Sequence, residues 1–179
     1  FHRPETLKSL LAQNDTVRNH MKHFPELDAA GFRQCQINAI HNIDISFAEN
    51  RPKALIQMAT GAGKTFTAIT AAYRLLKYGK MNRILFLVDT KSLGEQAERE
   101  FMVYRPNDDM RNFSQLYGVR RLKNSYIPND IQICISTPSG QFSNYNRIQL
   151  GQLSSCVLCL KLPVDFYTLC ITLNRPYPN

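Results

Sequence analysis

The stretch ATGAGKT, residues 59–65, decides the fold of this chain. It follows the short apolar run 54–58 and precedes a segment whose apolar residues have helical spacing. A strand, a glycine turn and a helix in this order build a phosphate cradle, because glycines let backbone N–H groups face phosphate oxygens. The helix N-terminus adds a partial positive charge. The pattern therefore predicts a loop that binds a nucleoside triphosphate.

Two side chains at the end of this stretch carry the expected chemistry. Lys64 would reach the β- and γ-phosphates, and the Thr65 hydroxyl would ligate Mg²⁺, so ATP and Mg²⁺ are the expected cofactors and these two residues the expected catalytic ones. Met58 stands where the pattern G-x-x-x-x-G-K-[ST] has its first glycine. A chance Gly-Lys-Thr in a loop is the alternative, which the flanking strand and helix patterns disfavour. The residues of this stretch expected to bind nucleotide are Thr60, Gly61, Ala62, Gly63, Lys64 and Thr65.

Composition and length limit the other possibilities. The 179 residues can form one sizeable core, and 44% hydrophobic with 20% charged residues is typical of a globular protein. The net charge of +8 favours a polyanionic partner, although charge alone is weak evidence. No apolar run reaches the length of a membrane span, so no membrane partner is expected. Five irregularly spaced cysteines beside a nucleotide motif predict a reducing cytoplasm. Because the chain begins at Phe1, we expect a piece of a longer protein.

The apolar pattern alternates between strands and helices. The helix after the glycine turn would place Phe66, Ile69, Tyr73 and Leu76 on one face. Strands that alternate with helices of this length imply right-handed crossovers and a parallel sheet. The expected fold class is therefore α/β, a P-loop parallel sheet flanked by helices. Further helices are expected at 5–23, 33–48 and 91–104, strands at 54–58, 84–88 and 131–135, and a possible short strand at 116–118.

The last part of the chain differs in composition. Thirteen of the 14 acidic residues lie within positions 1–130, which leaves only Asp165 in the final 49 residues. Cys156 and Cys159 have C-x-x-C spacing, but no second pair and no nearby histidine completes a zinc site. The change could mark a domain boundary, an insertion or an altered reading frame, and the sequence alone does not separate these.

Four segments, in this order, resemble motifs of superfamily 2 helicases. The wording LIQMATGAGKTFTA followed by RILFLVD most resembles the motor (R) subunit of type I restriction endonucleases. The resemblance covers residues 30–140. Residues 32–40 (FRQCQINAI) are similar to the upstream R-x-x-Q element, and residues 58–65 are similar to motif I, in which a first glycine is often absent. Residues 83–89, followed by Leu93 and Gln96, are similar to motif Ia, and residues 135–138 are similar to motif Ib.

The resemblance implies a RecA-like motor domain, here an incomplete first one at 31–140, with a helical lead-in at 1–30 and an atypical tail at 141–179. It implies that the full-length protein is a cytoplasmic hydrolase that translocates and cleaves DNA using ATP in restriction-modification. Its partners would be double-stranded DNA and the methylation and specificity subunits.

The resemblance also assigns residues outside the glycine turn. Gln36 would read the adenine edge, because an amide both donates and accepts, and Arg33 would support the same pocket or contact phosphate. An exposed helix residue and a plain surface arginine are the respective alternatives. Motifs Ia and Ib grip the nucleic-acid backbone, which makes Thr90, Lys91, Ser136 and Thr137 the DNA-binding candidates. Ordinary cap or loop residues compete at each position, and Thr90 could simply cap the helix at 91–104.

Some expected motor parts are missing from the sequence. Superfamily 2 motors carry a D-E-x-H-like motif II on a later strand, and no such pair follows Ile131. A second motor domain and a nuclease region are also not recognisable, so we expect little turnover by this piece alone. The alternatives are a type III restriction subunit or another superfamily 2 helicase, a noncatalytic nucleotide-binding or interaction module, and a P-loop ATPase unrelated to nucleic acid. The element around Gln36 and the motif Ia match disfavour the last.

Overall fold

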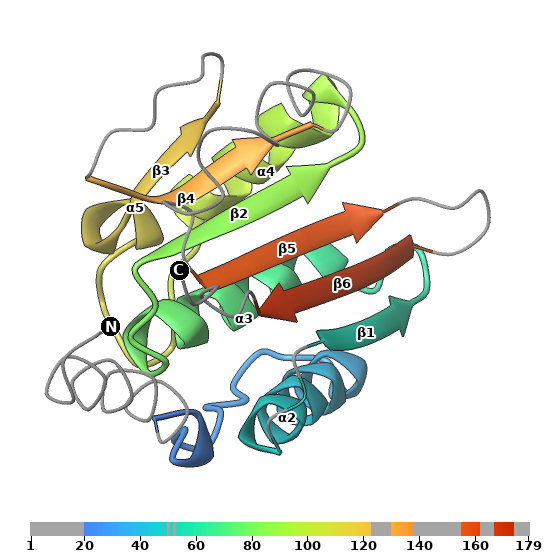
Figure 1. The fold of residues 1–179 in the computed structure, drawn as a ribbon, viewed down its shortest axis with the longest axis vertical. Coiled ribbons are helices and arrows are strands. Elements are labelled where there is room, and N and C mark those ends of the chain that lie inside the picture. Colours follow the sequence, from blue (N-terminus) through green and yellow to red (C-terminus); the bar gives the residue numbers. More distant parts are fainter. Residues whose placement is uncertain are drawn as a thin grey trace, which may run out of the picture.

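Six strands form one sheet in the computed structural model of this chain, in the order β1-β6-β5-β2-β4-β3 (Figure 1). The structure describes residues 20–49, 51, 53–122 and 130–137, together with the backbone of two strands at 155–161 and 167–173. The elements are α2 (Gln34–Ala48), β1 (Lys53–Met58), α3 (Lys64–Lys77), β2 (Arg83–Val88), α4 (Lys91–Val103), α5 (Phe113–Leu116), β3 (Gly118–Arg121), β4 (Ile131–Ser136), β5 (Ser155–Lys161) and β6 (Tyr167–Leu173).

Most of the sheet is parallel, which confirms the predicted fold class. Strands β5, β2, β4 and β3 run in the same direction, and β6 is antiparallel to both of its neighbours, β5 and β1. The antiparallel strand was not predicted. Only residues 162–166 separate β5 from β6, whereas a parallel crossover needs a dozen or more residues. The two strands therefore pair as a hairpin.

The strand directions bring several chain segments to one edge. Because β1 and β5 are both antiparallel to β6, β1 runs in the same direction as β5, β2 and β4. The carboxyl ends of these strands therefore share one edge of the sheet. The glycine turn after β1, the start of α4 after β2 and the residues after β4 all lie at that edge.

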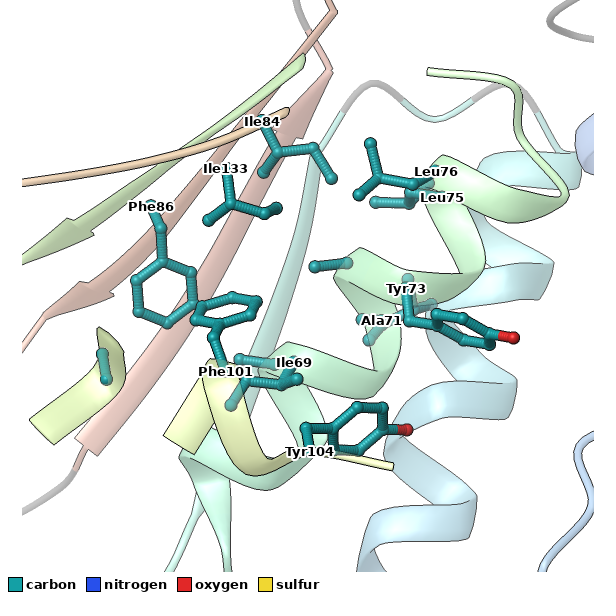
Figure 2. Packing of buried hydrophobic residues seen from close by; sticks show 14 of the residues in the cluster. Ile69, Ala71, Tyr73, Leu75, Leu76, Ile84, Phe86, Phe101, Tyr104 and Ile133 are labelled. Atoms are coloured by element: carbon teal, nitrogen blue, oxygen red, sulfur yellow. The ribbon is translucent and has the colours of Figure 1, made fainter. Parts of the chain in front are cut away.

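Helices α3 and α4 cover one face of the sheet, and both lie behind the strands in Figure 1. The core consists of alternate residues of β2 and β4 packed against apolar residues of α3 and α4. Figure 2 shows Ile84 and Ile133 pointing from the strands toward Leu75 and Leu76 of α3, and Phe86 pointing toward Phe101. The ring of Phe101 on α4 meets the Phe86 ring nearly at a right angle, with 5.2 Å between their centres. This packing fixes α3, and with it the turn that precedes the helix.

The helices at 33–48 and 91–104 and the strands at 54–58, 84–88 and 131–135 are confirmed within one or two residues at each end. The possible strand at 116–118 was wrong in position: Leu116 ends α5, and β3 begins at Gly118. Phe113, the first residue of α5, is buried, and this packing holds residues 113–116 in a helical turn. Most of the helix expected at 5–23 lies outside the described residues. None of the helices in the described part of the chain has the length and apolarity to cross a membrane.

Candidate functional site

The turn between β1 and α3 is built on two glycines. Gly61 and Gly63 have φ angles of 75° and 82°, in the left-handed region that residues with a Cβ atom rarely adopt. Gly63 is the N-cap residue of α3 and provides no side-chain cap. The first backbone N–H groups of a helix have no acceptor within the helix. A glycine cap adds no side-chain acceptor for these groups, as is typical of helix N-termini that bind anions.

Close packing by α2 is a second reason for the glycine at position 63. A Cβ atom added to Gly63 would collide with Nε2 of Gln36. By contrast, a Cβ atom added to Gly61 would meet nothing within 4 Å. The two glycines are therefore required for different reasons, Gly61 by backbone conformation alone and Gly63 by conformation and contact.

Lys64 lies over the turn that precedes it. Its Nζ donates to the carbonyl oxygens of Ala59 at 2.6 Å and Met58 at 3.3 Å. Burial lowers the pKa of its ammonium group below the usual 10.5. Thr65, the expected Mg²⁺ ligand, lies half-buried in the first turn of α3. The expected catalytic pair thus follows directly on the turn that presents the helix N-terminus.

Helix α2 holds the same turn from the other side. Nη1 of Arg33 donates to the Gly61 carbonyl at 2.7 Å, and Nε2 of Gln36 donates to the Ala62 carbonyl at 3.1 Å. Oε1 of Gln36 accepts from the Arg33 backbone N–H at 2.9 Å. Gln36 is only 6% exposed, so it is not the exposed helix residue considered as its alternative. The bonds to the Ala62 carbonyl and from the Arg33 N–H use half of the hydrogen-bonding capacity of the Gln36 amide. Recognition of adenine by Gln36 stays a prediction.

The DNA-binding candidates lie at the carboxyl edge of the sheet. Thr90 caps α4, accepting from the Leu93 N–H at 3.2 Å, which is the structural role considered as its alternative. Lys91 is the exposed first residue of α4. Ser136 ends β4 opposite Leu87 of β2, and Thr137 follows it. The structure thus places these residues at the same edge as the glycine turn, while DNA contact stays a prediction.

One charged pair between α2 and α3 was not predicted. Arg74 of α3 and Asp44 of α2 form a salt bridge of 2.8 Å, and their side chains are 5% and 18% exposed. Burial raises the pKa of the Asp44 carboxyl, although the guanidinium of Arg74 opposes this shift. The two residues stand 30 positions apart in the sequence, and no local pattern connects them.

In the described part of the chain, no group of three or more His, Cys, Asp or Glu residues could hold a metal ion by itself. Mg²⁺ is commonly held by one or two protein ligands together with phosphate oxygens and water. One hydroxyl in the first helical turn, next to the glycine turn, fits that donor set.

Comparison with known proteins supports the resemblance in the sequence. The family model described as "Type III restriction enzyme, res subunit" matches residues 30–157. The endonuclease subunit of type I restriction enzyme EcoKI from Escherichia coli (strain K12) is 33% identical over 138 residues, which cover 76% of this chain and 12% of that protein. The endonuclease subunit of SsaAORF53P from Staphylococcus saprophyticus is 32% identical over 98 residues, 54% of this chain and 10% of that protein.

A further relative comes from outside restriction enzymes. UvrABC system protein B of Leptospira biflexa is 33% identical over 93 residues, 52% of this chain and 13% of that protein. The chain thus spans about one-eighth or less of the length of these relatives. No solved structure matches the chain. The family match covers 128 of the 179 residues, with the glycine turn, β1 to β4 and α2 to α5 inside it, and the chain belongs to the family described as the res subunit of type III restriction enzymes.

Proposed function

We propose that this chain is the ATP-binding part of the first motor domain of a DNA-translocating subunit of a type I restriction endonuclease. The carrying observation is the glycine turn between β1 and α3, with two left-handed glycines, an uncapped helix N-terminus and Lys64 beside it. The family description names a type III enzyme, but the restriction relatives above are type I subunits, and these favour type I. A type III subunit or another superfamily 2 helicase is the alternative within the same class.

The residues of the turn would act together on the triphosphate of ATP. The first N–H groups of α3 would donate to phosphate oxygens, and the Lys64 ammonium would neutralise charge at the far end of the triphosphate. Thr65 would hold Mg²⁺, which offsets charge on the phosphate oxygens when it is bound. Arg33 and Gln36 would keep the turn in shape through the carbonyl oxygens of Gly61 and Ala62, and Gln36 would face the adenine.

We further propose that the 179 residues bind ATP but hydrolyse little of it. Phosphoryl transfer to water needs an acidic residue for the metal and a group that orients the water. From Ile131 to the end of the sequence the only carboxylate side chain is that of Asp165. Translocation and cleavage of DNA would then belong to the full-length protein, a cytoplasmic enzyme working with methylation and specificity subunits. The division at 1–30, 31–140 and 141–179 stays part of this proposal.

The DNA-binding edge would use Thr90, Lys91, Ser136 and Thr137 for backbone contacts. Such contacts need hydroxyl groups and cations but carry no base specificity. An excess of eight positive charges would make binding weaken as salt is added, because phosphate neutralisation releases counterions. An affinity for duplex DNA that does not change between low and high salt would contradict backbone contact by this edge.

A nucleotide titration tests the central proposal. The wild-type chain and Lys64→Ala are titrated with ATP in the presence of Mg²⁺ by calorimetry, and we expect the variant to bind at least tenfold more weakly. Identical affinities would refute the site. Turnover is measured on the same samples with and without duplex DNA, and DNA-stimulated hydrolysis by these 179 residues would refute the proposed lack of turnover. Binding of ATP without any DNA affinity would instead favour the noncatalytic nucleotide-binding module.

A further inference from the structure

The Arg74 guanidinium is held from three sides at the C-terminal half of α3. Its Nε and Nη2 donate to Oδ2 of Asp44 at 3.0 and 2.8 Å, and Nη2 also donates to the Pro25 carbonyl at 2.6 Å. The guanidinium carbon lies 5.5 Å from the ring centres of both Phe24 and Tyr78. The whole residue is 4% exposed. The guanidinium is therefore enclosed and the Asp44 carboxylate largely buried, so this is not a chance surface ion pair.

Stability alone does not explain such a pair. Removing two charges from water costs free energy that their attraction often fails to recover, and replacing a buried pair by apolar residues of similar volume is frequently neutral or stabilising. The best-attested role of buried charges is to fix the register of packed elements. The elements that meet at this pair are α2 and α3, because Asp44 belongs to one helix and Arg74 to the other.

The two helices are also in contact near their N-termini, beside the glycine turn. Gln36 in the first turn of α2 donates to the carbonyl of Ala62, just before α3 begins. The helices thus run side by side in the same direction, with one contact near their N-termini and the other toward their C-termini. From Gln36 to Asp44 the rise along α2 is about 12 Å, and from Lys64 to Arg74 the rise along α3 is about 15 Å. The second contact limits how far α2 can slide or rotate on α3.

We propose that Asp44 and Arg74 are positioning residues for nucleotide binding. The ion pair fixes the axial position of α2 on α3, so that Arg33 and Gln36 meet the carbonyl oxygens of Gly61 and Ala62 and hold the turn in its anion-binding shape. Neither member of the pair touches the nucleotide. The inference rests on the proposed function, because it concerns the same turn.

A double-mutant cycle on ATP affinity tests this coupling. Gln36→Ala in the wild-type background should weaken ATP binding about tenfold, as expected for the loss of a well-placed hydrogen bond. In the Asp44→Asn background the same Gln36→Ala change should weaken binding less than twofold, because Gln36 is already displaced. Sites this far apart that act independently would give additive effects. Equal effects of Gln36→Ala in both backgrounds would therefore overturn the inference.

A matched control separates positioning from a general loss of stability. Arg121 of β3 forms a half-buried ion pair with Glu98 of α4, at 2.6 Å, that involves neither α2 nor α3. Glu98→Gln should leave the tenfold effect of Gln36→Ala intact. A loss of the Gln36→Ala effect in the Glu98→Gln background as well would overturn the specific role of Asp44.

An apolar replacement keeps the test decisive if Asp44→Asn unfolds the chain. The double variant Asp44→Leu with Arg74→Met is expected to fold, because it buries no unpaired charge. It should bind ATP more weakly than wild type and show the same loss of the Gln36→Ala effect. Wild-type ATP affinity in this folded variant would overturn the inference. Failure of the proposed function looks different, because the wild-type chain would then bind ATP no better than Lys64→Ala.

Discussion

The two ends of α3 are held in opposite ways. At the N-terminal end, Gly61 and Gly63 shape the turn, and side chains of α2 donate to its backbone carbonyls. At the C-terminal end, charged and aromatic side chains of α3 itself make the contacts, to Asp44 of α2 and to Asp108 in the loop after α4. At the N-terminal end, which would receive the nucleotide, the contacts come in large part from side chains of α2. At the C-terminal end, side chains of α3 itself hold the helix in position.

Two tyrosines, Tyr73 of α3 and Tyr104 after α4, link the C-terminal half of α3 to the core. The Tyr73 hydroxyl donates to Oδ1 of Asp108 at 2.7 Å, and Nζ of Lys77 donates to Oδ2 at 2.8 Å. The Tyr104 hydroxyl donates to Oγ1 of Thr70, also on α3, at 2.9 Å. Figure 2 shows the hydroxyl groups of Tyr73 and Tyr104 pointing away from the strands, so their rings pack in the core while their oxygens bond to Asp108 and Thr70. These hydrogen bonds hold the C-terminal half of α3 against the loop after α4 and against the core.

Loss of the Arg74 side chain should give the largest effect. Arg74→Ala leaves the Asp44 carboxylate buried without its partner, and we expect the free energy of unfolding to fall by about 3–5 kcal/mol. Urea denaturation measures this loss. As a control, Arg111→Ala removes an arginine whose side chain is 63% exposed in its pair with Asp109, and it should leave the denaturation midpoint unchanged. Equal losses in the two variants would show that the C-terminal end of α3 does not depend on the buried pair.

The two glycines allow the N-terminal end to be tested in the same way. Gly61→Ala and Gly63→Ala both force a Cβ atom into the left-handed region, at a cost of about 1–2 kcal/mol each. Only Gly63→Ala also displaces the Gln36 amide. We therefore expect Gly63→Ala to lower the free energy of unfolding somewhat more than Gly61→Ala, and to lower the ATP affinity measured by calorimetry distinctly more. If Gly61→Ala weakens ATP binding more than Gly63→Ala, the contact between Gln36 and the turn is not what holds its shape.

The difference between the ends also explains what could be predicted from the sequence. The turn is contiguous in sequence, and glycines followed by Lys64 and Thr65 have a meaning that needs no tertiary information. The apolar run of β2 predicted a buried strand for the same reason. The pair between Asp44 and Arg74 joins residues 30 positions apart and depends on how α2 packs on α3, so no local sequence pattern predicts it. The direction of β6 likewise depends on its short connection to β5, which apolar spacing does not encode.

The smallest expected effect concerns the contact between α3 and the loop after α4, and it depends on pH. Burial alone would raise the pKa of Asp108, but hydrogen bonds from Lys77, Tyr78 and Tyr73 outweigh it and lower the pKa below the usual 3.8. A carboxyl group whose pKa is lower in the folded than in the unfolded state stabilises the fold above the unfolded pKa. That contribution disappears as the pH falls through the folded pKa. Asp108→Asn should therefore be less stable than wild type at pH 7, and the difference should shrink below pH 4.

Denaturation of both proteins at a series of pH values measures this difference. Other carboxylates contribute equally to the two curves, so subtraction isolates Asp108. The effect should be modest, because the side chain of Asp108 is 33% exposed and water screens its charge. Tyr78→Phe removes one donor to the same carboxylate and should show a smaller part of the same pH dependence. A stability difference between wild type and Asp108→Asn that stays constant from pH 7 to pH 3 would mean that the charge of Asp108 does not anchor the C-terminal end of α3.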